Sequence, residues 1–317
     1  MKRRDFIKSI GIAGTISLLD ARRTRGRDLW SDGGSAKTGL RAPFDLTLSA
    51  SGDLFVTDSP SYRVLRLDSS HRQVLSFGKP GAHVGRLNFP RGVAVGPDGL
   101  VYVVDSNNGR VEVFDESGTV KRVIGSIGSI GGTFSTPQGV CLDENGRLYV
   151  ADTRNHRIQI FENDELTAVL GDLGDDKDQF RLPTATAVRP GGEILVLDSK
   201  HGMVKVFGPD LKFRFGFGGV GSAPGMLNMP QGMKLDEQGI LWVADSGNHR
   251  IQQFSADGKL LSVFGKAGAG PGEYKNPTGI AFGRGKLYVA DNGNARIQVM
   301  ANEKFEILGL NNNIGSL

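Results

Sequence analysis

Short apolar runs and turn residues follow one another along most of the chain. Runs rich in Val, Ile, Leu, Tyr and Phe, such as LYVAD, RVEVF and RIQIF, are separated by clusters of Gly, Asp and Asn. Such runs are typical of strands, and pairs such as Asp98-Gly99 and Asn145-Gly146 accept the positive φ of hairpin turns. The runs show little strict alternation, as expected where both faces of a sheet are covered. The pattern predicts an all-β chain.

Two markers recur along the chain at almost constant spacing. An Asp at the end of one apolar run recurs at separations of 47, 47, 46, 47 and 46 residues, and a Pro at separations of 47, 47, 46, 47 and 47 residues. The six aspartates are Asp58, Asp105, Asp152, Asp198, Asp245 and Asp291, and the six prolines are Pro43, Pro90, Pro137, Pro183, Pro230 and Pro277. Repeats of this length with four strands each indicate radial blades around a channel. We therefore predict a six-bladed β-propeller with four antiparallel strands per blade.

The repeated residues resemble the NHL repeat. The resemblance is clearest in VADSGNHRIQQF and VFGKAGAGPGEYKNPTGIAF, and it covers about residues 40–310. NHL-repeat proteins form six-bladed propellers, so the resemblance implies the same fold. We assign residues 41–310 to the propeller, 28–40 to a linker and 311–317 to a tail. Because each copy contains four predicted strands, none is spare to close the ring, and residues 28–40 or 311–317 are the candidates for packing at the seam.

The first residues form a separate segment, MKRRDFIKSIGIAGTISLL. Arg3, Arg4, Phe6 and Lys8 resemble the pattern of a twin-arginine (Tat) signal, although Lys2 stands where Ser or Thr is usual. The apolar stretch that follows is shorter than the roughly 20 residues that a membrane-spanning helix needs. We therefore predict that residues 1–27 direct export by the Tat translocation machinery to the periplasm or another extracytoplasmic site. A small-x-small cleavage site is missing, so an uncleaved leader that tethers the protein to the membrane is the alternative.

The net charge of +4 is unevenly distributed along the chain. Residues 1–27 carry eight basic and two acidic residues, a net +6, which leaves −2 for residues 28–317. RNA-binding NHL propellers use a basic face, and the candidates for one here are Arg91, Arg154, Lys200, Lys266 and Lys275. Because the body is close to neutral, the sequence disfavours a nucleic-acid partner.

Most repeated polar residues are predicted to serve the scaffold. Five of the six aspartates are followed five residues later by an Arg, and Met203 takes this place in the fourth repeat. The five are Arg63, Arg110, Arg157, Arg250 and Arg296. We expect each Asp carboxylate to accept backbone N–H groups of the loop that follows it, and each Arg to tie that loop to carboxylates or carbonyls.

Function in a propeller is expected where the repeats differ, at the rim of the channel. The residues after the six prolines are Phe44, Arg91, Gln138, Thr184, Gln231 and Thr278. Asp45 and Lys234 interrupt rows of small residues slightly further along the same strands. We predict a ligand-binding rim made of Asp45, Arg91, Gln138, Thr184, Gln231, Lys234 and Thr278. Ordinary surface polarity around a water-filled channel is the alternative.

Metal sites are the remaining candidate chemistry. The amidating lyase that acts on peptidyl-α-hydroxyglycine resembles this chain and holds zinc through convergent histidines, but none of the histidines here occupies the rim. They are His71, His83, His156, His201 and His249. An acidic loop with Asp172, Asp175, Asp176 and Asp178 could suit calcium, although the EF-hand spacing fails. We predict no cofactor, with zinc or calcium as alternatives, and we expect the single cysteine, Cys141, to be a small packed residue.

These observations favour an exported, non-catalytic propeller that binds a protein, a peptide or a small ligand on its upper channel face. The alternative is a metal-dependent enzyme, similar to a lyase or a hydrolase, with its site at the channel mouth.

Overall fold

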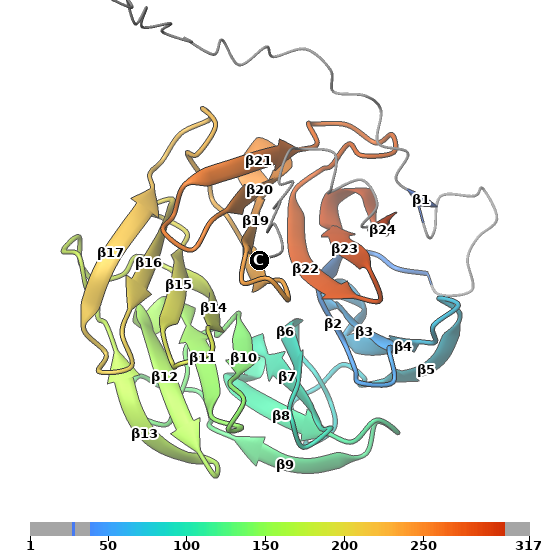
Figure 1. The fold of residues 1–317 in the computed structure, drawn as a ribbon. Helices are drawn as coiled ribbons and strands as arrows, with labels where there is room; N and C mark the ends of the chain where they lie inside the picture. The colour runs from blue at the N-terminus through green and yellow to red at the C-terminus, as the bar shows by residue number, and fades with distance from the viewer. Residues whose placement is uncertain (1–26, 29–38, 302–317) are drawn as a thin grey trace, which may run out of the picture.

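The computed structural model describes residues 27–28 and 39–301 of the chain. In this part the strands form six antiparallel sheets of four strands, arranged as blades around a channel (Figure 1). The prediction of an all-β, six-bladed propeller is confirmed. The predicted export signal, with Arg3, Arg4, Phe6 and Lys8, and the predicted tail lie outside the described residues. Within those residues, the structure contains no helix of the length and hydropathy needed to span a bilayer.

Each of the first five blades is built from four consecutive strands, with the first strand at the channel and the fourth at the outer edge. Blade one comprises β2 (Pro43–Leu48), β3 (Leu54–Asp58), β4 (Arg63–Leu67) and β5 (Gln73–Phe77); blade two comprises β6 (Pro90–Val95), β7 (Val101–Asp105), β8 (Arg110–Phe114) and β9 (Val120–Ile124); and blade three comprises β10 (Val140–Leu142), β11 (Leu148–Asp152), β12 (Arg157–Glu162) and β13 (Glu165–Leu170). Blade four comprises β14 (Pro183–Val188), β15 (Ile194–Asp198), β16 (Met203–Phe207) and β17 (Phe213–Gly218), and blade five comprises β18 (Gly232–Leu235), β19 (Leu241–Asp245), β20 (Arg250–Phe254) and β21 (Leu260–Phe264).

Single turns of 3-10 helix join the second and third strands in five of the blades. They are η1 (Ser59–Ser61), η2 (Ser106–Asn108), η3 (Thr153–Asn155), η4 (Ser246–Asn248) and η5 (Asn292–Asn294). Each ends on a residue in the left-handed region, such as Gly109 with φ 59° or His156 with φ 57°. In each of these five blades, the turn directly follows the aspartate that ends the second strand.

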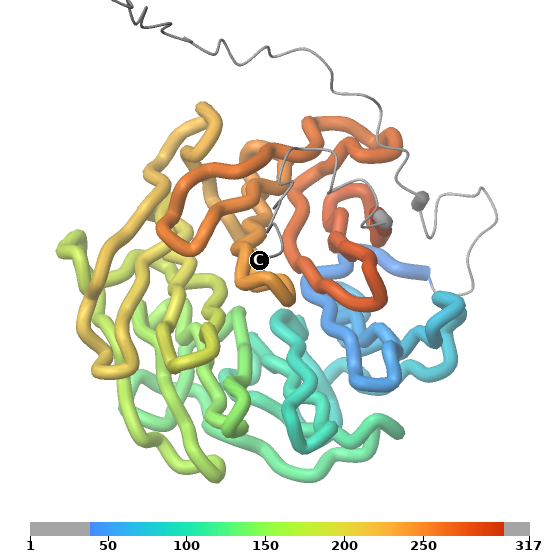
Figure 2. Tube along the Cα trace, viewed as in Figure 1, coloured from blue at the N-terminus to red at the C-terminus, as the bar shows by residue number. Residues whose placement is uncertain are grey.

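Blade six is built differently from the other five, and the expectation that every repeat supplies its own four strands is wrong for this blade. It contains β22 (Pro277–Gly283), β23 (Lys286–Asp291) and β24 (Arg296–Ala301), and its outermost strand is β1 (Arg27–Asp28) from the other end of the chain. Strand β1 pairs antiparallel with β24, with Arg27 opposite Val299 and Asp28 opposite Gln298. The chain therefore closes the ring by lending an N-terminal strand to the last blade, and Figure 2 shows that blade lying beside the first.

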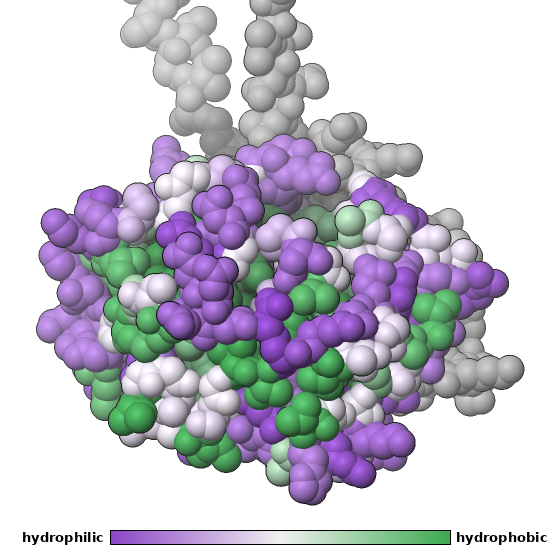
Figure 3. All heavy atoms as spheres, turned by 90° about the horizontal axis from the view of Figure 1, so that it is seen from below, coloured by the Kyte–Doolittle hydropathy of each residue, from purple (hydrophilic) through white to green (hydrophobic). Residues whose placement is uncertain are grey.

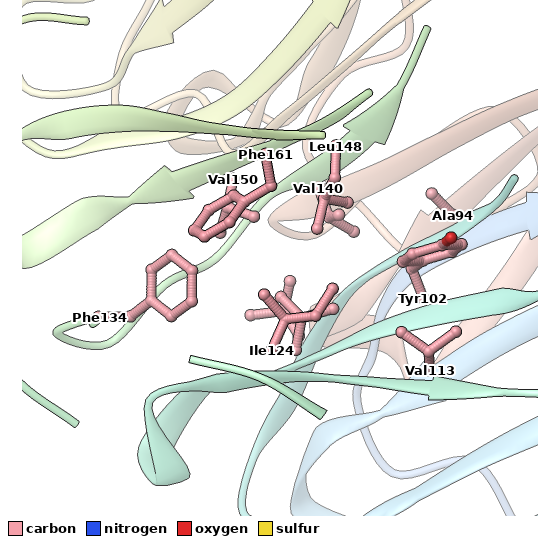
Figure 4. Packing of buried hydrophobic residues seen from close by; sticks show 11 residues of the cluster. Ala94, Tyr102, Val113, Ile124, Phe134, Val140, Leu148, Val150 and Phe161 are labelled. Carbon is pink, nitrogen blue, oxygen red and sulfur yellow. The ribbon is translucent and has the colours of Figure 1, made fainter. Parts of the chain in front are cut away.

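The hydrophobic core consists of six clusters, one between each pair of neighbouring blades. Between blades two and three, Tyr102 and Ile124 of one sheet face Val150 and Phe161 of the next, with Phe134 inserted from the connecting loop (Figure 4). Both faces of each blade are thus covered, which explains why the strands lack strict alternation. Viewed from the edge nearest β9 and β13, the surface mixes hydrophilic and hydrophobic patches (Figure 3).

Candidate functional site

Close approach of the inner strands shapes the channel wall. A Cβ atom added to Gly139 would lie 2.5 Å from the carbonyl oxygen of Thr184 in the next blade, and one added to Gly232 would lie 2.1 Å from that of Thr278. The neighbouring backbone therefore requires glycine at these two positions. Blade one differs at the equivalent position, where Asp45 carries a full side chain into the seam with blade two.

The channel contains a cavity of about 190 Å³, lined by residues of the inner strands. Six of the seven predicted rim residues line it, namely Asp45, Gln138, Thr184, Gln231, Lys234 and Thr278. The seventh, Arg91, donates to Oε1 of Gln138 at 3.1 Å and lies over the ring of Phe44 at 4.6 Å. The structure therefore brings the predicted rim residues together in and around one cavity.

Asp45 joins blades one and two at the cavity wall. Its Oδ1 accepts the backbone N–H of Leu46 at 2.9 Å, and its Oδ2 accepts that of Val93 in blade two at 3.0 Å. Burial raises the pKa of this carboxyl to about 6, against the opposing effects of the two N–H groups and of Lys234. Asp45 is thus an enclosed acid that is largely ionised at neutral pH and that faces the cavity.

Lys234 lines the same cavity from β18. Among the described residues, its ammonium makes no hydrogen bond and no ion pair within 4.0 Å. Its charge acts electrostatically on two other groups of the cavity wall, Asp45 and Cys141. An ammonium has three donors to satisfy, so this group is available to a ligand or to water.

Two of the predicted rim residues have scaffold partners instead. The hydroxyl of Thr184 donates to the carbonyl oxygen of Pro230 at 3.2 Å, and the hydroxyl of Thr278 donates to that of Pro43 at 3.4 Å. Each bond links an inner strand to the next blade around the ring. These threonines therefore contribute to the cavity wall mainly as links between blades.

Cys141 packs against the core cluster between blades three and four, as expected for a small packed residue, but it is only partly buried and also lines the cavity. Burial raises the pKa of its thiol to about 12, although the charge of Lys234 and a hydrogen bond with Thr186 act in the opposite direction. Because the thiolate is the reactive form, this thiol is expected to react slowly.

The reactivity of Cys141 provides a direct measurement of how enclosed the cavity is. We expect iodoacetamide to label the folded protein about a thousandfold more slowly than the urea-unfolded chain at mildly alkaline pH, because the raised pKa reduces the thiolate fraction by about that factor. Mass spectrometry of timed samples measures the rate, and the chain has only one cysteine to label. Equal rates in the folded and unfolded protein would contradict an enclosed thiol.

The six repeated aspartates are fully buried at the start of the turns between the second and third strands. In contrast to the expectation, their backbone N–H donors lie in the connection that enters the blade, about 17 residues earlier, such as Asn228 for Asp245 at 2.7 Å. The loop that follows contributes an asparagine side chain instead, as Asn248 does for Asp245. Arg250 bonds Asp245 at 2.7 Å and also three carbonyl oxygens of the entering connection. Each aspartate therefore anchors the path from one blade into the next.

A third member of this network, seven residues after the aspartate, was not recognised in the sequence. Gln159, Gln252 and Gln298 donate to the aspartate and to a carbonyl oxygen of the entering connection. Blade two has the fully buried Glu112 at this position. Its Oε2 accepts the backbone N–H of Gly85 at 2.9 Å, whereas its Oε1 lies 2.5 Å from Arg110 and accepts no hydrogen bond. Burial raises the pKa of Glu112 to about 7, although Arg110 has the opposite effect. A carboxylate thus occupies a position that suits an amide donor.

Blade four has a lysine and a histidine beside its aspartate in place of the missing arginine. Lys205, which is buried, takes the glutamine position and lies 3.1 Å from Asp198. His201 contacts Asp198 through Nδ1 at 2.6 Å and Asp175 of the acidic loop through Nε2 at 2.9 Å. Although Met203 is neutral, Asp198 thus keeps a cationic partner in Lys205, and this carboxylate contacts the connecting loops as the others do.

Four of the five histidines, and Asp175 of the acidic loop, are engaged in local contacts. Nδ1 of His156 accepts the backbone N–H of Leu182 at 3.2 Å, and Nδ1 of His249 accepts that of Asn276 at 3.1 Å. Burial lowers the pKa of His156. The described residues contain no group of three or more His, Cys, Asp or Glu side chains that could hold a metal ion.

Comparison with known families agrees with the repeated geometry. Residues 87–114, 134–161, 227–254 and 274–300 match the NHL repeat. These four segments carry the NHL repeat pattern. The four matches fall in blades two, three, five and six, and each runs from the entering connection to the third strand of its blade. Blades one and four lie outside the matches, and in blade four Met203 and Lys205 stand where the matched blades two, three, five and six have Arg and Gln or Glu.

Solved structures of several kinds share the fold of this propeller. Virginiamycin B lyase from Staphylococcus aureus is 13% identical with a TM-score of 0.59, and the match covers 87% of this chain and 98% of the lyase. A gluconolactonase from Xanthomonas campestris is 15% identical with a TM-score of 0.63, covering 83% and 86% of the two chains. An auxiliary nutrient binding protein from Bacteroides thetaiotaomicron is 13% identical with a TM-score of 0.64, covering 83% and 69%. No curated protein sequence matches the chain. At these identities the likeness concerns the fold alone.

Proposed function

We propose that this chain is an exported, non-catalytic NHL propeller that binds a small ligand in its channel. The observation that carries the proposal is the Lys234 ammonium, which lines the cavity without an ion pair or hydrogen bond from the described residues. Three other blades have alanine at the equivalent position, namely Ala94, Ala187 and Ala281. The scaffold therefore does not require a lysine there, and an enclosed ammonium suits an anionic group of a ligand.

The size of the cavity favours a small molecule over a peptide or protein. Pockets for drug-sized ligands are typically about 300–1,000 Å³, and this one has about 190 Å³. The fold itself serves nutrient binding in one structural neighbour and catalysis in two others. The proposal therefore rests on the cavity and its charges rather than on likeness.

Protection of Cys141 tests the proposed site whatever the chemical identity of the ligand. We expect a low-mass extract of the cell envelope to slow alkylation of Cys141 severalfold, because a ligand on Lys234 would cover the thiol in the same cavity. The variant Lys234→Ala should lose this protection, whereas Lys259→Ala, which changes an exposed lysine of the same blade, should keep it. Equal protection in both variants, or none in the unmodified protein, would count against a channel site.

Export is the second part of the proposal. A cut after Ala21 would leave strand β1 in the mature chain, so removal of the leader is compatible with ring closure. Replacing Arg3 and Arg4 together by lysine is expected to retain the protein in the cytoplasm, because Tat signals depend on the arginine pair. Cell fractionation and immunoblotting measure the distribution, and undiminished export of the variant would reject a Tat signal.

A further inference from the structure

Two opposite charges face the cavity without touching each other. Asp45 lies on β2 of blade one, Lys234 lies on β18 of blade five, and both side chains line the cavity. Lys234 lowers the pKa of Asp45, so the two charges lie within electrostatic reach. No ion pair within 4.0 Å joins them. The cavity wall therefore carries one acidic and one basic side chain that do not pair with each other.

Asp45 and Lys234 are each the only charged residue at their position in the six repeats. The residues equivalent to Asp45 are Gly92, Gly139, Ala185, Gly232 and Gly279, and those equivalent to Lys234 are Thr47, Ala94, Cys141, Ala187 and Ala281. The other blades form the same wall without a charged residue at either position. Two independent departures from non-adjacent blades thus converge on a single cavity.

The binding capacity of both groups is only partly used. Each oxygen of Asp45 accepts one backbone N–H, and a carboxylate can accept about four hydrogen bonds. Arg91 does not neutralise Asp45, because its guanidinium is engaged by Phe44 and Gln138 at the rim. Beside the two charges, Met233 and Ile280 add largely buried apolar surface to the cavity wall. The wall thus offers an acceptor for a cation, a donor for an anion and an apolar patch.

We infer that the ligand of the proposed channel site is a small zwitterion of the α-amino acid class, with its ammonium on Asp45 and its carboxylate on Lys234. This inference rests on the proposed function, because it assumes that the channel cavity is the binding site. An α-amino acid carries its ammonium and its carboxylate on the same carbon atom, so one small molecule can present a cation to Asp45 and an anion to Lys234 within one cavity. A simple carboxylate would satisfy Lys234 only.

Calorimetric titration of the full chain with the twenty common amino acids tests the inference. For the amino acid that binds most tightly, the matched hydroxy acid and the matched decarboxylated amine are titrated as well. We expect the zwitterion to bind at least about tenfold more tightly than either analogue. Asp45→Ala should remove the preference over the hydroxy acid, and Lys234→Ala should remove the preference over the amine. Both variants introduce the residue found in another blade, and Lys259→Ala serves as the matched control.

The outcomes separate this inference from the proposed function. Equal binding of the amino acid and the hydroxy acid, or no binding by any amino acid at millimolar concentration, overturns the zwitterion assignment. If the extract still protects Cys141 in a manner that depends on Lys234, the channel site itself stands. If an amino acid binds equally well to Asp45→Ala and Lys234→Ala, it binds elsewhere, which overturns the assignment. Urea unfolding of each variant shows whether a loss of binding reflects a loss of folding.

Discussion

Replacing Asp245 by alanine is expected to lower the free energy of unfolding by about 3–5 kcal/mol, the usual cost of removing one partner of a buried ion pair. Asp245 is fully buried, and its carboxylate meets Arg250 at 2.7 Å, Gln252 at 2.9 Å and the N–H of Asn228 at 2.7 Å. The substitution would leave all these donors, including a largely buried guanidinium, without their shared acceptor. Urea unfolding followed by tryptophan fluorescence measures the loss.

A matched control for this prediction lies in the same blade. Asp257 forms an exposed pair with Lys259 at 3.0 Å, and surface pairs of this kind contribute little to stability. Asp257→Ala should therefore leave the unfolding midpoint where it is. Similar midpoints for the two variants would show that the buried aspartates do not hold the blades together.

The variant Glu112→Gln is expected to be more stable than the natural protein by about 3 kcal/mol at a pH of about 8, and nearly equal to it at a pH of about 4. Burial raises the pKa of Glu112 from 4.5 to about 7. A carboxyl with a higher pKa in the folded state binds its proton more tightly there than in the unfolded chain. The free energy of unfolding is therefore highest below a pH of about 4.5, and it falls as the pH rises towards about 7. Glutamine has no proton to lose and is the residue found at this position in blades three, five and six.

Urea unfolding of both proteins across this pH range measures the difference. The converse change, Gln159→Glu in blade three, meets a similar arrangement of Asp152 and Arg157, and it should introduce the same pH dependence. A constant difference between Glu112→Gln and the natural protein at all pH values would contradict a titrating carboxyl at this site.

The sequence predicted the blades well because their determinants are local. Turn pairs such as Asp98-Gly99 and a constant spacing of Pro and Asp are readable from adjacent residues, and they define strands and period without tertiary information. The convergence of Asp45 and Lys234 on the channel also followed from the repeats, because equivalent positions of six blades face one axis. The rim could therefore be located before its contacts were known.

The remaining features depend on contacts between distant segments. Arg27–Asp28 has no strand signal of its own, and it becomes a strand only because β24 offers an unpaired edge. The donors for Asp245 come from a connection 17 residues earlier, which returns to it only after the blade has folded. The position of Glu112 was readable in principle, since RIQIF, RIQQF and RIQVM share a glutamine that RVEVF lacks. Only the structure shows why glutamine suits this position, because its amide donates to a carbonyl oxygen and to the buried aspartate.

A crystal structure of the protein grown with its tightest-binding amino acid tests the central claim most directly. The claim predicts one ordered ligand in the channel, with its carboxylate within hydrogen-bonding distance of Lys234 and its ammonium within that distance of Asp45. A channel holding only water, with the amino acid bound on another face, would contradict it.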